Sequence, residues 1–131
     1  MAKYASPEFL DGGFTGFKAN VNKVILLKAY SVGDNYATVN VTNNICEAAV
    51  DTSDFVLSGA NAAPRVMTFQ PGTSGTASGG STQGVDDLHI AFVDTVNSKI
   101  YWVTDETTNQ SVTSGNTVNF PQLTYTADQP T

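Results

Sequence analysis

The strongest constraint on the fold is a pair of apolar segments in the second half of the chain, separated by a short polar one. Residues 88–93 and 99–104 are rich in β-branched and aromatic side chains, and residues 94–98 between them are polar. Such side chains favour strands, and a short polar connection between two of them is typical of a β-hairpin. The pattern therefore predicts two antiparallel strands that pair with each other.

Further strand signals occur about every ten residues along the chain. Residues 36–41 alternate polar and apolar side chains, which is the period of a half-buried strand. The abundance of Thr, Asn, Ser and Gly suits strands and tight turns better than helices. We therefore predict a mainly β, single-domain antiparallel β-sandwich or barrel of about seven or eight short strands. The other expected strands are 21–30, 45–50, 55–57, 65–69 and 118–125.

The N-terminal segment 6–19 has the pattern of a short helix. It starts with a capping residue, a proline and an acid, and three apolar residues follow on one helical face. Three glycines within it each cost about 0.8–1 kcal/mol relative to alanine, so the helix needs a surface to pack on. That surface is the chain's own β core by default, or otherwise a neighbouring subunit. The residues are Ser6, Pro7 and Glu8, then Leu10, Phe14 and Phe17, with Gly12, Gly13 and Gly16.

These patterns divide the chain into three parts. Residues 1–20 form an N-terminal arm or short helix, residues 21–125 form the β domain, and residues 126–131 form a tail without structure of its own. Within the β domain, residues 71–84 have the Gly, Ser and Thr content of a flexible loop, although their middle can pair as a strand.

The charge distribution excludes several classes of partner. Only 14% of the residues are charged and the net charge is −6. Residues 1–30 are mildly basic, whereas the remainder contains only Arg65 and Lys99 against ten acids. Nucleic-acid binding requires clustered basic residues, so it is not expected. No window approaches the roughly 18 apolar residues of a membrane span, and the start lacks an apolar signal core. We expect no membrane association, and synthesis and retention in a cytoplasm unless the protein is released by lysis.

The residues that could support chemistry lack obvious partners in the sequence. His89 and Cys46 are the sole residues of their types, so a zinc site lacks ligands and no intramolecular disulfide can form. Three acid pairs fall at expected turns, where Asp commonly bonds its own backbone. We therefore expect no enzyme activity, no cofactor and no metal site; calcium binding at one of these loops and a small hydrolase with an acid pair stay open as less favoured alternatives. The pairs are Asp51 with Asp54, Asp86 with Asp87, and Asp105 with Glu106.

Tyr101 and Trp102 offer an alternative, a stacking platform for sugars. Neighbours on a strand usually face opposite sides of the sheet, so one ring is more often in the core and the other outside. A carbohydrate-binding module therefore stays open as a less favoured function.

Four segments together resemble small structural proteins of tailed-bacteriophage virions. They are residues 6–11 with 17–20, the strand 88–94, the triplet 102–104, and residues 113–120 with the sequence TSGNTVNF. Those proteins typically have a short N-terminal helix, a β domain and a final strand of this kind. Gly12 and Gly13 stand where the relatives more often have helix formers.

The resemblance implies a capsid decoration (cement) protein, made in the host bacterial cytoplasm and located on the virion surface. Its partners would be the major capsid protein and neighbouring copies of itself, with a tail or head–tail component as the alternative. Aromatic side chains commonly dominate interfaces of this kind. We expect the N-terminal arm to dock, with residues 71–84 as a second contact. The docking residues expected are Lys3, Tyr4, Phe9, Phe14, Phe17 and Lys18.

Overall fold

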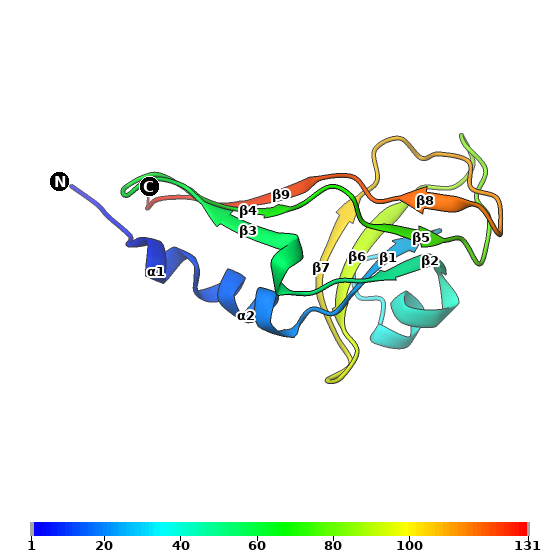
Figure 1. The fold of residues 1–131 in the computed structure, drawn as a ribbon, viewed down its shortest axis with the longest axis horizontal. Helices are drawn as coiled ribbons and strands as arrows, with labels where there is room; N and C mark the ends of the chain where they lie inside the picture. Colours follow the sequence, from blue (N-terminus) through cyan, green and yellow to red (C-terminus); the bar gives the residue numbers. More distant parts are fainter. Residues whose placement is uncertain (1, 131) are drawn as a thin grey trace.

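A computed structural model of the chain describes residues 2–130, apart from the side chain of Phe9. Strands make up most of its regular structure, and helices occur mainly near the N-terminus (Figure 1). In chain order the elements are α1 (Pro7–Leu10), α2 (Gly12–Asn20), β1 (Lys23–Leu27), η1 (Thr38–Thr42), β2 (Asn44–Ala49), η2 (Thr52–Asp54), β3 (Phe55–Ser58), β4 (Arg65–Phe69), β5 (Ser74–Thr76), β6 (His89–Asp94), β7 (Lys99–Asp105), β8 (Thr117–Asn119) and β9 (Leu123–Ala127).

The strands form three antiparallel sheets. Within residues 2–130 there are nine strands, in the orders β2-β1-β6-β7, β3-β4-β9 and β5-β8. The sheets pack as a sandwich-like fold and do not close into a barrel. The predicted fold class is therefore confirmed, and so is the hairpin, whose strands are β6 and β7.

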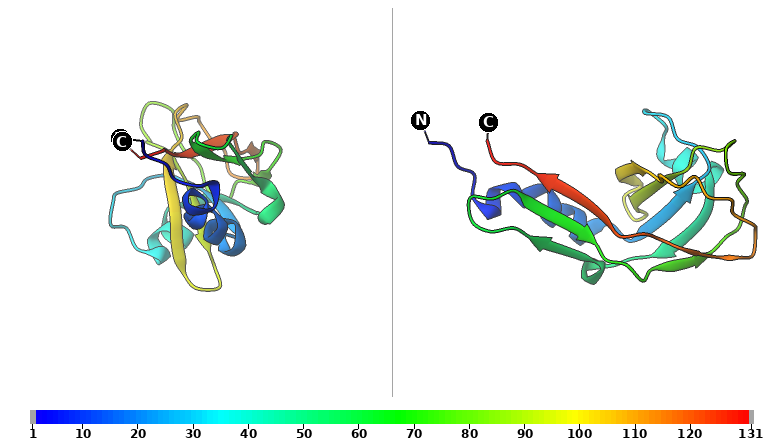
Figure 2. Two further views of the ribbon diagram at one scale, coloured as in Figure 1. Left: turned by 90° about the vertical axis from the view of Figure 1, so that its left-hand side faces the viewer. Right: turned by 90° about the horizontal axis from the view of Figure 1, so that it is seen from above.

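The molecule is elongated, and its two ends differ. One end holds both termini, α1, α2 and the three-stranded sheet, and the other holds the four-stranded sheet with the β5–β8 pair (Figures 1 and 2). The main core lies where the two larger sheets and α2 meet, around the fully buried Phe92, Phe55 and Phe69.

Strand alternation gives the four-stranded sheet two buried faces. Val24 and Leu26 of β1 point into the main core, whereas Ile25 and Leu27 point the other way. Those two pack with Val39 of η1 in a second, smaller core. The segment between β1 and β2 therefore covers the face of the sheet that lies opposite α2.

The predicted N-terminal helix is present, but it breaks at Asp11 between α1 and α2. Both carboxylate oxygens of Asp11 accept hydrogen bonds from the guanidinium of Arg65, each at 2.9 Å. This bidentate pair joins the break to the start of β4. Phe14 and Phe17 of α2 are buried, so the helix packs on the chain's own core, as in the default alternative.

The strand predicted for residues 36–41 is wrong, because this segment forms a turn of π-helix, η1. The Asn35 side chain accepts a hydrogen bond from the backbone N–H of Thr38 at 2.9 Å, which starts the turn. Tyr36 and Val39, three residues apart, both pack on the smaller core. Packing on that face thus outweighs the alternating pattern.

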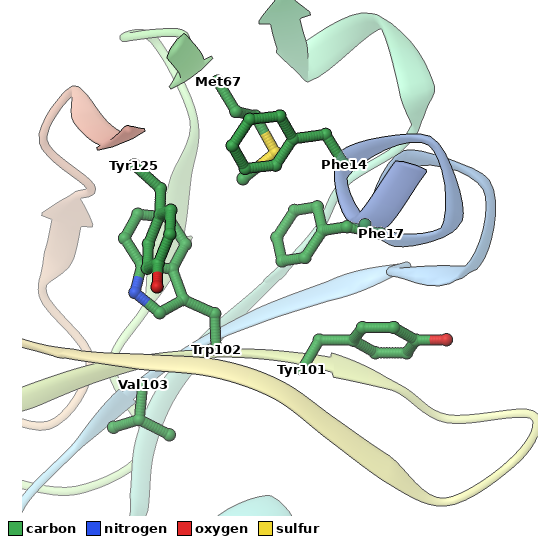
Figure 3. Close-up of a pocket in the computed structure, with 8 residues that line it drawn as sticks. Phe14, Phe17, Met67, Tyr101, Trp102, Val103 and Tyr125 are labelled. Carbon is green, nitrogen blue, oxygen red and sulfur yellow. The ribbon is translucent and has the colours of Figure 1, made fainter. Parts of the chain in front are cut away.

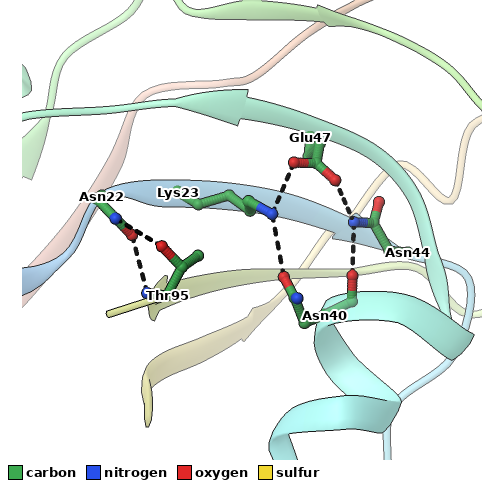
Figure 4. A network of polar contacts seen from close by, with 6 residues as sticks. All are labelled: Asn22, Lys23, Asn40, Asn44, Glu47 and Thr95. Atoms are coloured by element: carbon green, nitrogen blue, oxygen red, sulfur yellow. Dashed lines mark hydrogen bonds and ion pairs between the residues drawn. The ribbon is translucent and has the colours of Figure 1, made fainter. Parts of the chain in front are cut away.

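Side-chain hydrogen bonds attach η1 to the sheet (Figure 4). Lys23 donates to Asn40 at 3.1 Å and forms an ion pair with Glu47 at 2.7 Å. The Asn44 amide donates both to Glu47 and to the Asn40 carbonyl, each at 2.9 Å. Together these contacts hold η1 against β1 and β2, and the pair Asn22–Thr95 ties the start of β1 to the end of β6.

The Gly-rich segment 71–84 is held by the chain itself. Its middle forms β5, paired with β8, as the sequence allowed. Ser78 and Gly79 then donate backbone hydrogen bonds to the carbonyl of Ile45. Gly75 is required here, since a Cβ would lie 2.3 Å from the carbonyl oxygen of Glu47. The segment is therefore part of the fold.

The C-terminal region also differs from expectation. Residues 118–125 were predicted as one strand, but β8 and β9 belong to different sheets and separate around Pro121, which has no N–H for a ladder. Strand β9 continues to Ala127, into the segment expected to be an unstructured tail. Beyond it, the side-chain amide of Gln129 bonds the N–H and the carbonyl of Ala5, each at 3.0 Å.

Candidate functional site

An open groove of about 490 Å³ lies between α2, β7 and β9 (Figure 3). Aromatic side chains dominate its lining, and none of the lining residues is charged. Its size falls in the range of ligand pockets, roughly 300–1,000 Å³. The lining residues are Gly13, Phe14, Phe17, Met67, Tyr101, Trp102, Val103 and Tyr125.

A β-bulge in β7 builds one wall of this groove. Phe92 of β6 pairs with Trp102, but the next residue, Val93, pairs with Ile100, so Tyr101 is an extra residue without a partner. As a result Tyr101 and Trp102 point to the same side of the sheet, and Val103 points to the other (Figure 3). The expectation that these two neighbours face opposite sides is therefore wrong, because the bulge interrupts the alternation.

The aromatic rings form a layered wall, from buried to exposed. Phe17 is 5% exposed and has edge contacts with the core ring of Phe55 at 4.9 Å and with Tyr101 at 6.0 Å between centroids. Trp102 is half-buried and stacks on Phe92 at 5.1 Å. Tyr101 and Tyr125 are 38% and 51% exposed. Hence the core supports the inner rings, and the two tyrosines present polar hydroxyls and apolar faces at the rim.

On the helix side of the groove, glycines leave the surface of α2 without side chains. A Cβ added at Gly13, or at the nearby Gly12 and Gly16, would meet no atom within 4 Å. None of the three has a positive φ. Neither packing inside this chain nor backbone conformation therefore requires these glycines, although each costs helix stability.

Two strand edges border the same groove. Strand β7 is the last strand of the four-stranded sheet, and β9 is the last strand of the three-stranded sheet. Tyr101 and Trp102 lie on the first edge and Tyr125 on the second. An edge strand presents backbone N–H and C=O groups that can pair with another chain.

The expected docking residues lie in different surroundings. Phe14 and Phe17 are 8% and 5% exposed and belong to the core, and both also line the groove. Lys3 and Tyr4 are exposed on the N-terminal arm, and Lys18 is half-buried beside a second hollow near Leu57. The docking role of these five residues stays a prediction. The side chain of Phe9 lies outside the described part of the structure.

Four of the six paired acids bond the backbone of their own turns, as expected. Asp51 and Asp54 form a reciprocal cap on η2, and hydrogen bonds from Ser53 hold the pKa of Asp51 below its usual value. Asp86 and Glu106 also accept backbone N–H bonds, from Thr82 and Thr108. Asp87 and Asp105 instead lie beside His89. Cys46 is buried in the core, and burial raises the pKa of its thiol.

Two residues of the groove have no local signal in the sequence. Met67 and Tyr125 come from β4 and β9, which are far from β7 along the chain, and no local pattern links them. Sequence patterns single out Phe14 and Phe17 on the helix and the pair Tyr101–Trp102, but the shared orientation of that pair depends on the bulge.

Comparison with known proteins yields no relative of this chain. No family model matches it, no curated protein matches it, and no solved structure matches it. Among residues 2–130, no helix is long and apolar enough to cross a membrane. Function is therefore inferred from the groove, its strand edges and the sequence.

Proposed function

We propose that this protein is a capsid decoration (cement) protein of a tailed bacteriophage. It binds the outside of the shell formed by the major capsid protein, contacts neighbouring copies of itself, and stabilises the head without a chemical step. The observation that supports this role best is the uncharged aromatic groove between the two strand edges β7 and β9. The sequence resemblance to small virion proteins supports the major capsid protein as the partner.

The occupant of the groove is an extended segment of the major capsid protein. Such a segment adds as a strand to the edge of β7 or β9, where backbone hydrogen bonds provide affinity. Its apolar side chains fit between Tyr101 and Tyr125, over the supported ring of Trp102. Aromatic side chains of this type commonly dominate binding energy. The low glycine surface of α2 leaves room for the backbone of the partner.

The lining favours a peptide over a sugar. Sugar recognition uses aromatic stacking together with polar groups that bond several hydroxyls, and pockets fix orientation through such groups. The lining residues here include no carboxylate and no side-chain amide. The groove therefore supports the carbohydrate-binding alternative only through its rings. A tail or head–tail component would lie at the portal or tail and not on the shell, so the location of the protein on the particle distinguishes this alternative from a decoration protein.

The test is co-sedimentation of the purified protein with shells of the major capsid protein, followed by cryo-electron microscopy of the complex. The protein should bind at a fixed number of copies per shell subunit, on the outer surface. Tyr101→Ala and Tyr125→Ala should each weaken binding at least tenfold, since buried aromatic anchors contribute about 2 kcal/mol or more. Val32→Ser, a change at a residue that is 97% exposed, is the matched control and should bind normally.

Two results would contradict the proposal. Absence of the protein from the shell, with density at the portal or tail, would exclude the decoration role. Equal binding by the tyrosine variants and by Val32→Ser would show that the groove is not the contact surface. A glycan array provides the corresponding test of the sugar alternative, for which we expect no hits.

A further inference from the structure

Three potential metal ligands meet at the end of the β6–β7 hairpin that lies away from its loop. One nitrogen of His89 and one carboxylate oxygen from each of Asp87 and Asp105 all lie within 4.8 Å of one another. His89 and Asp105 are direct cross-strand partners. Asp87 precedes His89 by two residues, just before the start of β6.

The β-bulge at Tyr101 creates this meeting. Near the loop the paired residues are Asp94 with Lys99, and continuing that register would place Thr104 opposite His89. The extra residue shifts the register by one, so that Asp105 is opposite His89 instead. The same irregularity that builds the aromatic groove on one face of the sheet therefore assembles the three ligands on the other.

The imidazole of His89 is oriented as a ligand would be. Its Nδ1 lies 3.1 Å from the backbone carbonyl oxygen of Asp87, and a carbonyl can only accept, so Nδ1 carries the proton. In the neutral ring the lone pair is then on Nε2, which lies 4.0 Å from a carboxylate oxygen of Asp105. Metal-bound histidines typically donate their other N–H to a carbonyl or carboxylate in this way. The ring of Tyr30 packs at 5.7 Å and restrains the imidazole further.

We propose that His89, Asp87 and Asp105 bind one divalent transition-metal ion of the Zn²⁺ or Mn²⁺ class. Nε2 of His89 and one oxygen of each carboxylate are the protein ligands, and water completes the coordination. The two carboxylates supply the negative charge that neutralises the ion. Calcium and magnesium prefer all-oxygen sites, so the imidazole favours a transition metal over both.

The three ligand atoms need to move only a little to coordinate one ion. Bonds of about 2.0–2.2 Å place adjacent ligand atoms roughly 3–3.5 Å apart, so the atoms must approach by about 1–2 Å. The side chain of Asp105 is 57% exposed and can rotate, whereas that of His89 is 18% exposed and is held in place. Metal binding therefore clamps the start of β6 to the end of β7 and locks the bulged register.

Isothermal titration calorimetry and NMR of the protein without an affinity tag test this proposal. ZnCl₂, MnCl₂, CaCl₂ and MgCl₂ are the probes. His89 is the sole histidine of the chain, so its imidazole ¹⁵N signals are unambiguous. We expect one Zn²⁺ per chain, a shift of the Nε2 signal, and a rise in Tm with added Zn²⁺. Binding of Ca²⁺ and Mg²⁺ should be at least tenfold weaker.

Variants locate the ion. His89→Gln and Asp105→Asn should each weaken Zn²⁺ binding at least tenfold, because loss even of a supporting residue costs about 10–100-fold. Asp86→Asn is the matched control, since this neighbouring carboxylate bonds the N–H of Thr82 and lies outside the cluster. Its affinity should be unchanged.

Three outcomes would overturn the inference. They are no 1:1 binding at millimolar Zn²⁺, tighter binding of Ca²⁺ than of Zn²⁺, and undiminished binding by His89→Gln. The imidazole signal of the unmodified protein decides the question even where a variant fails to fold.

Discussion

Replacing Phe17 by alanine tests whether α2 belongs to the core of the free protein. The sequence allowed two surfaces for this helix, the chain's own β core or a neighbouring subunit. Phe17 is 5% exposed, and its ring contacts Phe55, Phe92, Tyr101 and Trp102. A helix that docked only on a partner would leave this ring in water and make its truncation nearly neutral.

The expected cost follows from burial. Truncation of a buried phenylalanine to alanine costs about 3–5 kcal/mol, and the dense contacts of Phe17 place it at about 4 kcal/mol. Domains are stable by about 5–15 kcal/mol, so the variant should still fold but unfold at a much lower urea concentration. Trp102, the sole tryptophan, reports the transition, because its ring lies 6.3 Å from that of Phe17.

Tyr4→Ala is the matched control from the same N-terminal segment. Tyr4 is 54% exposed, so its replacement should change the free energy of unfolding by no more than about 0.5 kcal/mol. A loss below about 1 kcal/mol for Phe17→Ala, similar to that of the control, would refute the packing of α2 described above. Should Phe17→Ala not fold at all, Phe17→Leu preserves most of the apolar volume and should show a smaller loss of the same sign.

Three further predictions concern single residues. Gly16→Ala should stabilise the protein by about 0.5–1 kcal/mol in urea unfolding, since the new methyl group meets no atom within 4 Å and the helix gains propensity; a loss of stability would contradict this. The side chain of Asn97, together with backbone N–H groups, holds the pKa of Asp94 below its usual value of about 3.9. The stabilisation that ionised Asp94 provides is thus complete above its usual pKa and is lost as the pH falls through the lower pKa of the folded state. The difference in the free energy of unfolding between wild type and Asp94→Asn should therefore shrink below about pH 4. Cys46 is 1% exposed with a raised thiol pKa, so it should react with Ellman's reagent only after unfolding; fast reaction in buffer would show that the core is open.

Local signals predicted the parts of the fold whose partners are close in sequence. The hairpin of residues 88–93 and 99–104 was identified because its two strands adjoin one loop, and β6 and β7 match it closely. The strand expected at residues 36–41 failed, because its alternating pattern also places Tyr36 and Val39 three residues apart, on one side of a turn. Packing against a distant strand decided between the two.

The candidate site was less predictable than the fold. Residues 100–103 are all apolar, so this stretch has no alternation from which an extra residue could be detected. The bulge at Tyr101 was therefore invisible, and with it both the shared orientation of Tyr101 and Trp102 and the pairing of His89 with Asp105. Met67 and Tyr125 reach the groove through the β4–β9 pairing, a contact between distant segments that no local pattern encodes.

Deletion of Tyr101 separates the two roles of the bulge. With that residue removed, Ile100 still pairs with Val93 and Trp102 still pairs with Phe92, so the strand becomes regular without a change of register on either side. The groove loses one rim tyrosine, and capsid binding should weaken as it does for Tyr101→Ala. The pairing of His89 with Asp105 is kept, and Zn²⁺ affinity should stay within about threefold of wild type.

The same deletion can refute the bulge itself. In a regular hairpin that contained Tyr101, Thr104 would be opposite His89, and only deletion of a residue would bring Asp105 to that position. A protein that binds no Zn²⁺ as wild type but binds it after deletion of Tyr101 would therefore show that the register lacks the bulge. Retained Zn²⁺ binding together with weakened capsid binding is the result expected from the structure, because the deletion removes a rim tyrosine of the groove but keeps Asp105 opposite His89.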